Sequence, residues 1–298
     1  MKIYFYGLHE CVINGKKSEL FFIDLLEKVF NENIEVSSLL EESDILFEDI
    51  YKQDTKLYEK KWKYTFLFSG ESDRRVRNTF LRESNRINTL KDYSCFLKGE
   101  KNNNNIINLP LFVCYSYYWN FDNLFINIPN PITIVPEKNI CVIVTNGDSE
   151  GRNYFFEKLE KMIPIDYDGE YKNNLPRIKY DHCTPEFINF VSQYKFIITM
   201  ENSKNETYIT EKILHGFTAN TIPVYWGSDY ITEYFNEERF INVKDFNEET
   251  INQSIEKILE IINNNEKFLE IVNKPIYKNN KIPFTIEKIA NEIKELIL

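Results

Sequence analysis

The segment from Tyr194 to Trp226 most constrains how this chain can fold. It begins with the apolar run Tyr194–Met200, which has the length and the residue types of a buried strand. This run ends at the polar residues Glu201-Asn202-Ser203, and a helical pattern follows over Tyr208–Thr218. The apolar run Thr221–Trp226 then predicts a second strand. A strand, a helix and a strand in this order indicate a parallel α/β sheet.

The same alternation of strands and helices extends over both halves of the chain. In the amino-terminal half the predicted elements are Lys2–Leu8, Ser18–Phe30, Asp44–Phe47, Lys63–Phe68, Tyr93–Leu97 and Leu109–Trp119. In the other half they are Ile140–Val144, Arg152–Met162, Ile165–Tyr167, Pro185–Gln193, Asn247–Ile262 and Thr285–Leu298. The run Ile128-Pro129-Asn130-Pro131 interrupts the pattern between them. We therefore predict an amino-terminal α/β domain over 1–130, a second α/β domain over 136–275 and a helical tail over 276–298.

The charge of the chain and its lack of common motifs exclude several classes of protein. The formal net charge is -10 and no basic run is present, so we expect no binding to nucleic acid. The sequence contains no GxSxG, Walker A or GxGxxG motif. Hydrolase, P-loop and NAD-dependent functions therefore have no support in the sequence.

Cysteine usage and hydropathy indicate a compartment. Five cysteines occur without CxxC spacing, mostly inside apolar runs, which is typical of reduced thiols in a cytosolic protein. No apolar stretch is long enough to cross a bilayer. We expect a soluble, cytoplasmic protein without a transmembrane segment, and we leave peripheral contact with a membrane open. The oligomeric state is not predicted.

Polar residues after the predicted strands are the first candidates for a binding site, because ligands of open α/β sheets lie at the carboxyl ends of the strands. The residues Glu201-Asn202-Ser203 occupy such a position. The following segment, Tyr208-Ile209-Thr210-Glu211-Lys212, opens a predicted helix, whose free N–H groups and nearby lysine suit a diphosphate. Spacing alone equally allows Glu211 and Lys212 to cover the solvent side of that helix.

The residues from Tyr194 to Leu214, with the following Thr221–Gly227, carry a longer signature. They contain Glu-Asn-Ser, then Tyr-Ile-Thr-Glu-Lys, then Ile-Pro-Val-Tyr-Trp-Gly. In order and spacing this strongly resembles the signature of the α-1,3/α-1,4-fucosyltransferase family, glycosyltransferase family 10. The resemblance implies a GT-B-like α/β fold, in which two Rossmann-type domains face an interdomain cleft.

The resemblance also implies which residues bind the donor, GDP-fucose. Asn202, Tyr208, Glu211 and Lys212 would contact its diphosphate, ribose and fucose ring. The family places an arginine just after the first strand of its nucleotide domain, and Arg152 matches that position. A guanidinium offers a planar fork that fits phosphate oxygens. Without this context, Arg152 would be interpreted as a solvated helix residue.

A shorter motif in the amino-terminal half indicates a catalytic base. Phe68-Ser69-Gly70-Glu71 follows a predicted strand and resembles the family motif that ends in the proposed general base, so Glu71 is the candidate. Partial burial at a strand end would raise the pKa of such a carboxyl toward a useful value. Glu100 has a similar setting and is the alternative base, and an ordinary exposed turn carboxylate is the alternative interpretation of Glu71.

The function implied is an inverting transfer of L-fucose from GDP-fucose to a hydroxyl of a glycan acceptor. Two alternatives stay open: a glycosyltransferase of the same fold that uses another GDP- or UDP-linked deoxysugar, and a non-catalytic protein that binds sugar nucleotides or glycans. The acceptor and the linkage cannot be predicted. The amino-terminal domain, which would hold the acceptor, has the weaker resemblance.

One sequence pattern is of the kind that holds a divalent metal ion against the leaving diphosphate. Asp166-Tyr167-Asp168 is formally a DxD triplet, which many glycosyltransferases use to hold a divalent ion. The resemblance instead aligns Asp166 and Gly169 with a structural strand and turn. We therefore expect no metal site and no required cofactor, with Arg152, Lys212 and nearby N–H groups stabilising the diphosphate.

Overall fold

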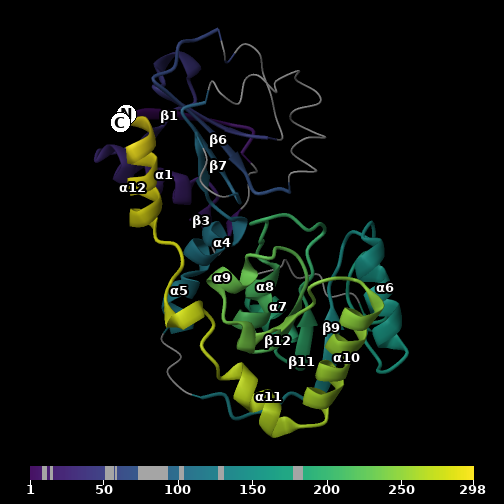
Figure 1. Ribbon diagram of the computed structural model, residues 1–298. Coiled ribbons are helices and arrows are strands. Elements are labelled where there is room, and N and C mark those ends of the chain that lie inside the picture. The colour runs from purple at the N-terminus through teal and green to yellow at the C-terminus, as the bar shows by residue number, and fades with distance from the viewer. Residues whose placement is uncertain are drawn as a thin grey trace. The chain divides into compact units, whose positions relative to one another are not determined.

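The structure is a computed structural model. It describes residues 1–8, 12–13, 16–50, 57, 59–72, 93–100, 104–126, 131–176 and 184–298. The predicted linker around Pro129 lies mostly outside them. The chain forms two compact units (Figure 1): unit 1 comprises Met1–Trp119, Asn205–Tyr208 and Phe284–Leu298, and unit 2 comprises Asn120–Lys204 and Ile209–Pro283.

Unit 1 is built on a parallel sheet of order β4-β1-β5-β6-β7-β8. Its strands are β1 Lys2–Tyr6, β4 Glu35–Val36, β5 Ile45–Asp49, β6 Tyr64–Ser69, β7 Cys95–Lys98 and β8 Ile106–Asn108. A separate antiparallel pair is formed by β2 Val12–Ile13 and β3 Lys16–Lys17. All residues of β5 and β7 are buried, as expected for central strands of a parallel sheet with both faces covered.

The helices of unit 1 bury an aromatic core against this sheet. They are α1 Leu20–Phe30, α4 Leu111–Trp119 and α12 Ile286–Ile297. From α1, Phe22 packs on Phe47 and Phe68, with ring centroids 4.5 Å and 4.8 Å apart. Helix α12, near the carboxyl end of the chain, lies alongside α1 in Figure 1 and belongs to the same unit.

Unit 2 is built on a second parallel sheet, of order β10-β9-β11-β12-β13. Its strands are β9 Lys138–Val142, β10 Asp166–Tyr167, β11 Tyr194–Ile198, β12 Ile222–Tyr225 and β13 Ile241–Asn242. Its α-helices are α5 Phe121–Ile126, α6 Glu150–Glu160, α7 Pro185–Val191, α8 Lys212–Thr218, α9 Ile231–Tyr234, α10 Glu248–Ile262 and α11 Asn265–Val272.

The central strand β11 shows why this sheet is covered on both faces. Phe196 and Ile198 lie in a core with residues of α6, α10 and α11, whereas Tyr194 and Ile197 lie in a smaller core with residues of α7. Every residue of β11 is buried. The continuous apolar run in the sequence therefore reflects a strand with two apolar faces.

The structure confirms the predicted parallel α/β architecture, and most predicted elements lie within two or three residues of the observed ones. The predicted helix over Tyr208–Thr218 is the main difference, since α8 begins only at Lys212. The reason lies in two side-chain hydrogen bonds: the N–H of Thr210 donates to the side chain of Glu201, and the Thr210 hydroxyl accepts from the N–H of Lys212. These side-chain bonds replace a first helical turn.

Two further findings concern the cysteines and the helices. Cys95, Cys114 and Cys141 are buried free thiols, as predicted, whereas Cys11 and Cys183 lie outside the described residues. Among the helices that the structure describes, none has both the length and the apolar character needed to span a membrane.

Candidate functional site

The candidate site lies at the carboxyl edge of the sheet in unit 2. Strands β9, β11 and β12 are adjacent and parallel, with Ile198 paired to Val142 on one side and to Val224 on the other. The loops that follow these strands therefore leave the sheet next to one another. They carry Asn146 after β9 and Glu201 after β11.

Glu201 is the centre of the polar contacts at this edge. Its side chain is completely buried, and its carboxylate accepts hydrogen bonds from the Thr210 N–H at 2.8 Å and from the Thr210 hydroxyl at 2.9 and 3.0 Å. The ammonium of Lys212 donates to the same carboxylate at 3.1 Å. Burial raises the pKa of Glu201, and the nearby Lys212 opposes that shift. A buried carboxylate with these partners meets the usual requirement that buried charges be paired.

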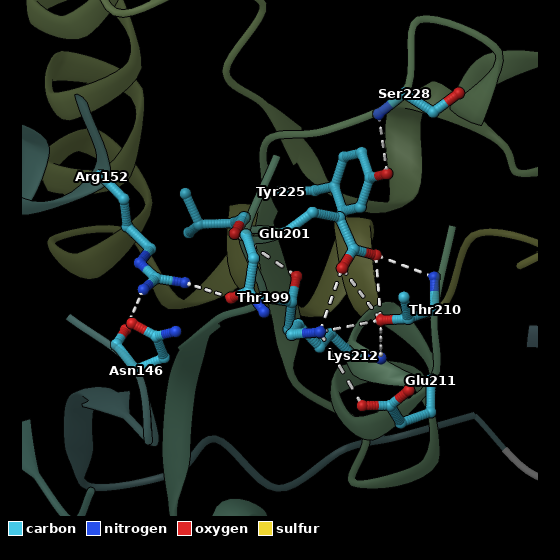
Figure 2. A network of polar contacts seen from close by, with 11 residues as sticks. Asn146, Arg152, Thr199, Glu201, Thr210, Glu211, Lys212, Tyr225 and Ser228 are labelled. Atoms are coloured by element: carbon cyan, nitrogen blue, oxygen red, sulfur yellow. Dashed lines mark hydrogen bonds and ion pairs between the residues drawn. The ribbon is translucent and has the colours of Figure 1, made fainter. Parts of the chain in front are cut away.

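Lys212 is held by two oxygen atoms at once. Its ammonium lies 3.1 Å from a Glu201 oxygen and 3.0 Å from the Thr210 hydroxyl oxygen. Its side chain nevertheless keeps 27% of its surface exposed, in contrast to the completely buried Glu201. Figure 2 shows the side chains of Lys212, Thr210 and Glu201 pointing toward one another. Such a placed cation is suited to a phosphate group.

The turn after β12 closes over Glu201. The N–H of Glu201 donates to the carbonyl of Trp226 at 2.8 Å, and the buried hydroxyl of Tyr225 accepts from the N–H of Ser228 at 3.0 Å. A Cβ atom at Gly227 would lie 2.7 Å from Cγ of Glu201, closer than real Cβ contacts. Gly227 is therefore required here for close approach, because only a residue without a side chain lets the turn pack on Glu201.

Arg152 adds a second cation to the edge. It lies in the first turn of α6 and is 1% exposed, and its guanidinium donates to Oδ1 of Asn202 at 3.0 Å and to the carbonyl of Asn146. Its Nε has no hydrogen-bond partner among the described residues. Burial lowers the pKa of Arg152, and the negative charge of Glu201 opposes that shift. Glu201 therefore stabilises the charge of Arg152 as well as that of Lys212.

The structure brings together some of the residues predicted to bind the donor. Arg152 contacts the exposed Asn202, and Glu211 precedes α8 with a carboxylate oxygen 3.9 Å from the Lys212 ammonium. Tyr208 is buried and belongs to the short segment Asn205–Tyr208 of unit 1. One of the helix N–H groups expected for a diphosphate is committed, because the N–H of Lys212 donates to the Thr210 hydroxyl at 3.4 Å.

The candidate bases lie in unit 1, after adjacent strands. Glu71 follows β6, and its N–H donates to the Ser69 hydroxyl at 3.2 Å, which fixes the turn. Glu100 follows β7, and its carboxylate forms an ion pair with the buried Lys98.

Both acidic residues of the DxD triplet bind groups of the protein. Asp166 accepts from the Tyr194 hydroxyl at 2.7 Å and lies 3.6 Å from the Lys138 ammonium. Asp168 accepts from the side-chain amide of Asn173 at 3.3 Å. Within the described ranges, no group of three His, Cys, Asp or Glu side chains is arranged to hold a metal ion. The expectation that no metal is required stays a prediction.

The sequence pattern places Glu201 at a strand end without indicating a role for it, and it singles out neither Thr210 nor Gly227. Burial is what makes Glu201 important, and burial of a glutamate is rare enough that sequence alone argues against it. One signal is present in the sequence: Glu201 directly follows the mainly apolar run Tyr194–Met200, and the next charged residue is Lys204.

Comparisons with known proteins agree with this geometry. Residues 136–278 match the family model described as glycosyltransferase family 10 (fucosyltransferase) C-term. The α-(1,3)-fucosyltransferase FucT of Helicobacter pylori is 35% identical over 104 residues, which are 35% of this chain and 21% of that protein. The mouse 4-galactosyl-N-acetylglucosaminide 3-α-L-fucosyltransferase 9 is 31% identical over 144 residues, covering 46% of this chain and 37% of that protein. The chain thus spans between about a fifth and two fifths of the length of these relatives.

A solved structure extends the likeness over the whole fold. The crystal structure of an α1,3-fucosyltransferase with GDP-fucose superposes with a TM-score of 0.67 and 18% sequence identity, covering 100% of this chain and 90% of that one. The chain therefore has the GT-B-like fold, with a parallel α/β sheet in each unit. The family match covers unit 2 almost completely and contains all the residues of the polar network. Residues 136–278 of this chain therefore carry the domain described as glycosyltransferase family 10 (fucosyltransferase) C-term.

Proposed function

We propose that the chain is a glycosyltransferase that moves L-fucose from GDP-fucose to a hydroxyl group of a glycan acceptor, with inversion at the anomeric carbon. The observation that carries the proposal is the pair of placed cations, Arg152 and Lys212, inside the matched family domain. Both lie at the carboxyl edge of the unit 2 sheet, where ligands of α/β sheets bind. A nucleoside diphosphate is the leaving group that two such cations suit.

The two cations would act mainly on the leaving group. As the bond between the anomeric carbon and the phosphate oxygen breaks, the diphosphate gains negative charge and the sugar takes on oxocarbenium character. Arg152 and Lys212 are already held by neighbouring oxygens, so little reorganisation accompanies the reaction. Preorganised donors of this kind lower the barrier to such a step. Asn202, Tyr208 and Glu211 are proposed to contact the donor beside them.

Glu71 is proposed as the general base. It would accept the proton of the acceptor hydroxyl while that oxygen forms its bond to the anomeric carbon from the face opposite the diphosphate. The assignment is supported by the motif Phe68-Ser69-Gly70-Glu71 and by the turn in which the N–H of Glu71 donates to the Ser69 hydroxyl. The acceptor class is proposed from the mouse relative, whose name specifies a 4-galactosyl-N-acetylglucosamine unit.

The test is transfer from GDP-fucose to a panel of glycans that begins with 4-galactosyl-N-acetylglucosamine, together with the variants Glu71→Gln and Glu100→Gln. We expect Glu71→Gln to lose turnover by about a hundredfold or more and to keep GDP binding, because loss of a general base acts on chemistry. Glu100→Gln is expected to keep most of the turnover. Equal turnover in Glu71→Gln and wild type would contradict the assignment of the base.

The same assay separates the alternatives. A protein that uses another sugar would turn over GDP-mannose or a UDP-linked sugar instead of GDP-fucose. A non-catalytic binding protein would bind GDP-fucose and release no GDP with any acceptor of the panel. Either result would replace the proposed activity.

A further inference from the structure

The proposed function does not explain why the site contains a completely buried glutamate. Glu201 is 0% exposed, and its carboxylate has the same sign of charge as a diphosphate, yet it is the acceptor that links Thr210 and Lys212. Burying a carboxylate costs several kcal/mol unless good partners compensate for it. A residue that only filled space at this position would be apolar. A buried charge at this position therefore indicates a role in the site around it.

The position of Glu201 is determined by the sheet rather than by α8. Its backbone N–H donates to the carbonyl of Trp226, and Gly227 packs against its side chain. The strand β11 that precedes it is buried on both faces. The position of Glu201 is therefore set by the buried sheet of unit 2.

From that fixed point Glu201 sets the geometry of the segment that carries Lys212. One carboxylate oxygen accepts from the Thr210 N–H at 2.8 Å, and the other lies 3.1 Å from the Lys212 ammonium. The Thr210 hydroxyl lies within hydrogen-bond distance of both Glu201 oxygens and of the Lys212 ammonium. A lysine side chain has large rotational freedom in solution, and these bonds remove it before any ligand arrives.

We infer that Glu201 is the positioning residue for the cation that binds the donor diphosphate: it fixes the Lys212 ammonium and the Thr210 turn from a completely buried site. This inference rests on the proposed function. Glu201 does not contact the donor, and it acts through Lys212. The alternative is that Glu201 only stabilises the fold, so that its loss would weaken the protein without any specific link to Lys212.

A double-mutant cycle distinguishes these roles. The variants are Glu201→Gln, Lys212→Met and the double variant, and the measurement is the Kd for GDP by titration calorimetry. Glutamine keeps the size of the side chain but replaces one oxygen by an NH₂ donor that faces other donors. We expect Glu201→Gln to weaken GDP binding about tenfold in the wild-type background and less than about threefold when Lys212 is already methionine. Glu248→Gln, which removes a 59%-exposed carboxylate elsewhere in unit 2, is the matched control and should keep the wild-type Kd.

Three results would overturn the inference: an equal loss in both backgrounds, an unchanged Kd in Glu201→Gln, or tighter binding of GDP. Folded wild-type protein that binds no GDP at all would instead remove the proposed function, and the inference with it. Binding of GDP by wild type combined with an equal loss in both backgrounds removes the inference alone.

A second pair of variants covers the case in which Glu201→Gln does not fold. Thr210→Val removes the hydroxyl that joins Glu201 to Lys212 at nearly unchanged volume, whereas Thr210→Ser keeps it. We expect Thr210→Val to weaken GDP binding severalfold and Thr210→Ser to bind GDP as wild type does. Equal Kd values for the two Thr210 variants would overturn the inference.

Discussion

The ammonium of Lys212 lies 3.1 Å from a carboxylate oxygen of Glu201, and the two side chains differ sharply in exposure, 27% against 0%. One member of this ion pair therefore belongs to the protein interior and the other reaches the surface of the site. The ion pair therefore holds a cation at the edge of the unit 2 sheet against a residue that is buried in that unit. It also makes the charge of Glu201 depend on Lys212, which leads to the first prediction.

Lys212→Met should destabilise the protein in a pH-dependent way. Burial raises the pKa of Glu201, and Lys212 opposes that shift, so removing Lys212 raises the pKa further. When the pKa of a carboxyl is higher in the folded than in the unfolded state, the free energy of unfolding of the protein decreases as the pH rises through the folded-state pKa. We expect a loss of about 2–4 kcal/mol in the free energy of unfolding at pH 8, and a smaller loss at pH 5.

Urea unfolding at the two pH values measures this difference. Lys267→Met is the control, because its partner Glu260 is 58% exposed and can keep its charge in solvent. If Lys212→Met lowers the free energy of unfolding equally at pH 5 and at pH 8, Glu201 does not become protonated in this variant at pH 5, and the prediction is wrong.

Arg152→Lys should weaken GDP binding although it keeps the positive charge. The guanidinium contacts Asn202 and the carbonyl of Asn146 together, and an ammonium cannot reproduce that planar fork. We expect the Kd for GDP to rise about tenfold. Lys158→Ala removes a cation from the same helix that pairs with Glu248 and should leave the Kd unchanged. A Kd for Arg152→Lys equal to that of wild type would mean that the charge alone matters.

Asn202→Asp should separate stability from ligand binding. The new carboxylate would stand about 3 Å from the guanidinium of Arg152, where the amide oxygen now lies. We expect unfolding midpoints equal to or above those of wild type, because the substitution forms an ion pair. GDP binding should become at least about tenfold weaker, because a negative charge stands beside the phosphate site. Asn202→Ala, which adds no charge, should lose less affinity, and an affinity loss as large as that of Asn202→Asp would contradict this account.

Gly227→Ala should disturb the turn that covers Glu201. The added methyl group would lie 2.7 Å from Cγ of Glu201, in a region where Tyr225 is also completely buried. Overpacking of this kind costs about 1–3 kcal/mol in the free energy of unfolding. Asp229→Ala, at an exposed position two residues further on, is the control. Unchanged thermal unfolding of Gly227→Ala would show that the turn can move aside without cost.

Sequence patterns predicted the fold well because the sheet strands are continuous apolar runs. Residues of β11 and β12 could be assigned from composition alone, and the amphipathic helices α10 and α12 end within a residue of the predicted limits. The start of α8 could not be predicted, because it is decided by Glu201, which binds the Thr210 N–H from a different element. Helix propensity depends on residues that are neighbours in the chain, so it cannot predict a hydrogen bond to a side chain of another element.

The candidate site could be predicted only in part, because some of its residues act through contacts between different elements of the fold. The family resemblance predicts donor contacts for both Arg152 and Asn202, and the structure places these two residues in contact. Glu201 was not selected, because its role follows from complete burial and from the turn at Gly227, which are properties of the folded sheet. The roles of Glu71, Tyr208 and Glu211 stay predictions that the proposed experiments address.

Titration calorimetry of the wild-type protein with GDP and with UDP tests the central claim, that the edge carrying Arg152 and Lys212 holds the diphosphate of a guanine nucleotide. We predict that GDP binds, that UDP binds much more weakly, and that Arg152→Lys and Lys212→Met each weaken GDP. Binding of UDP in preference to GDP, or binding of GDP that neither variant changes, would contradict it.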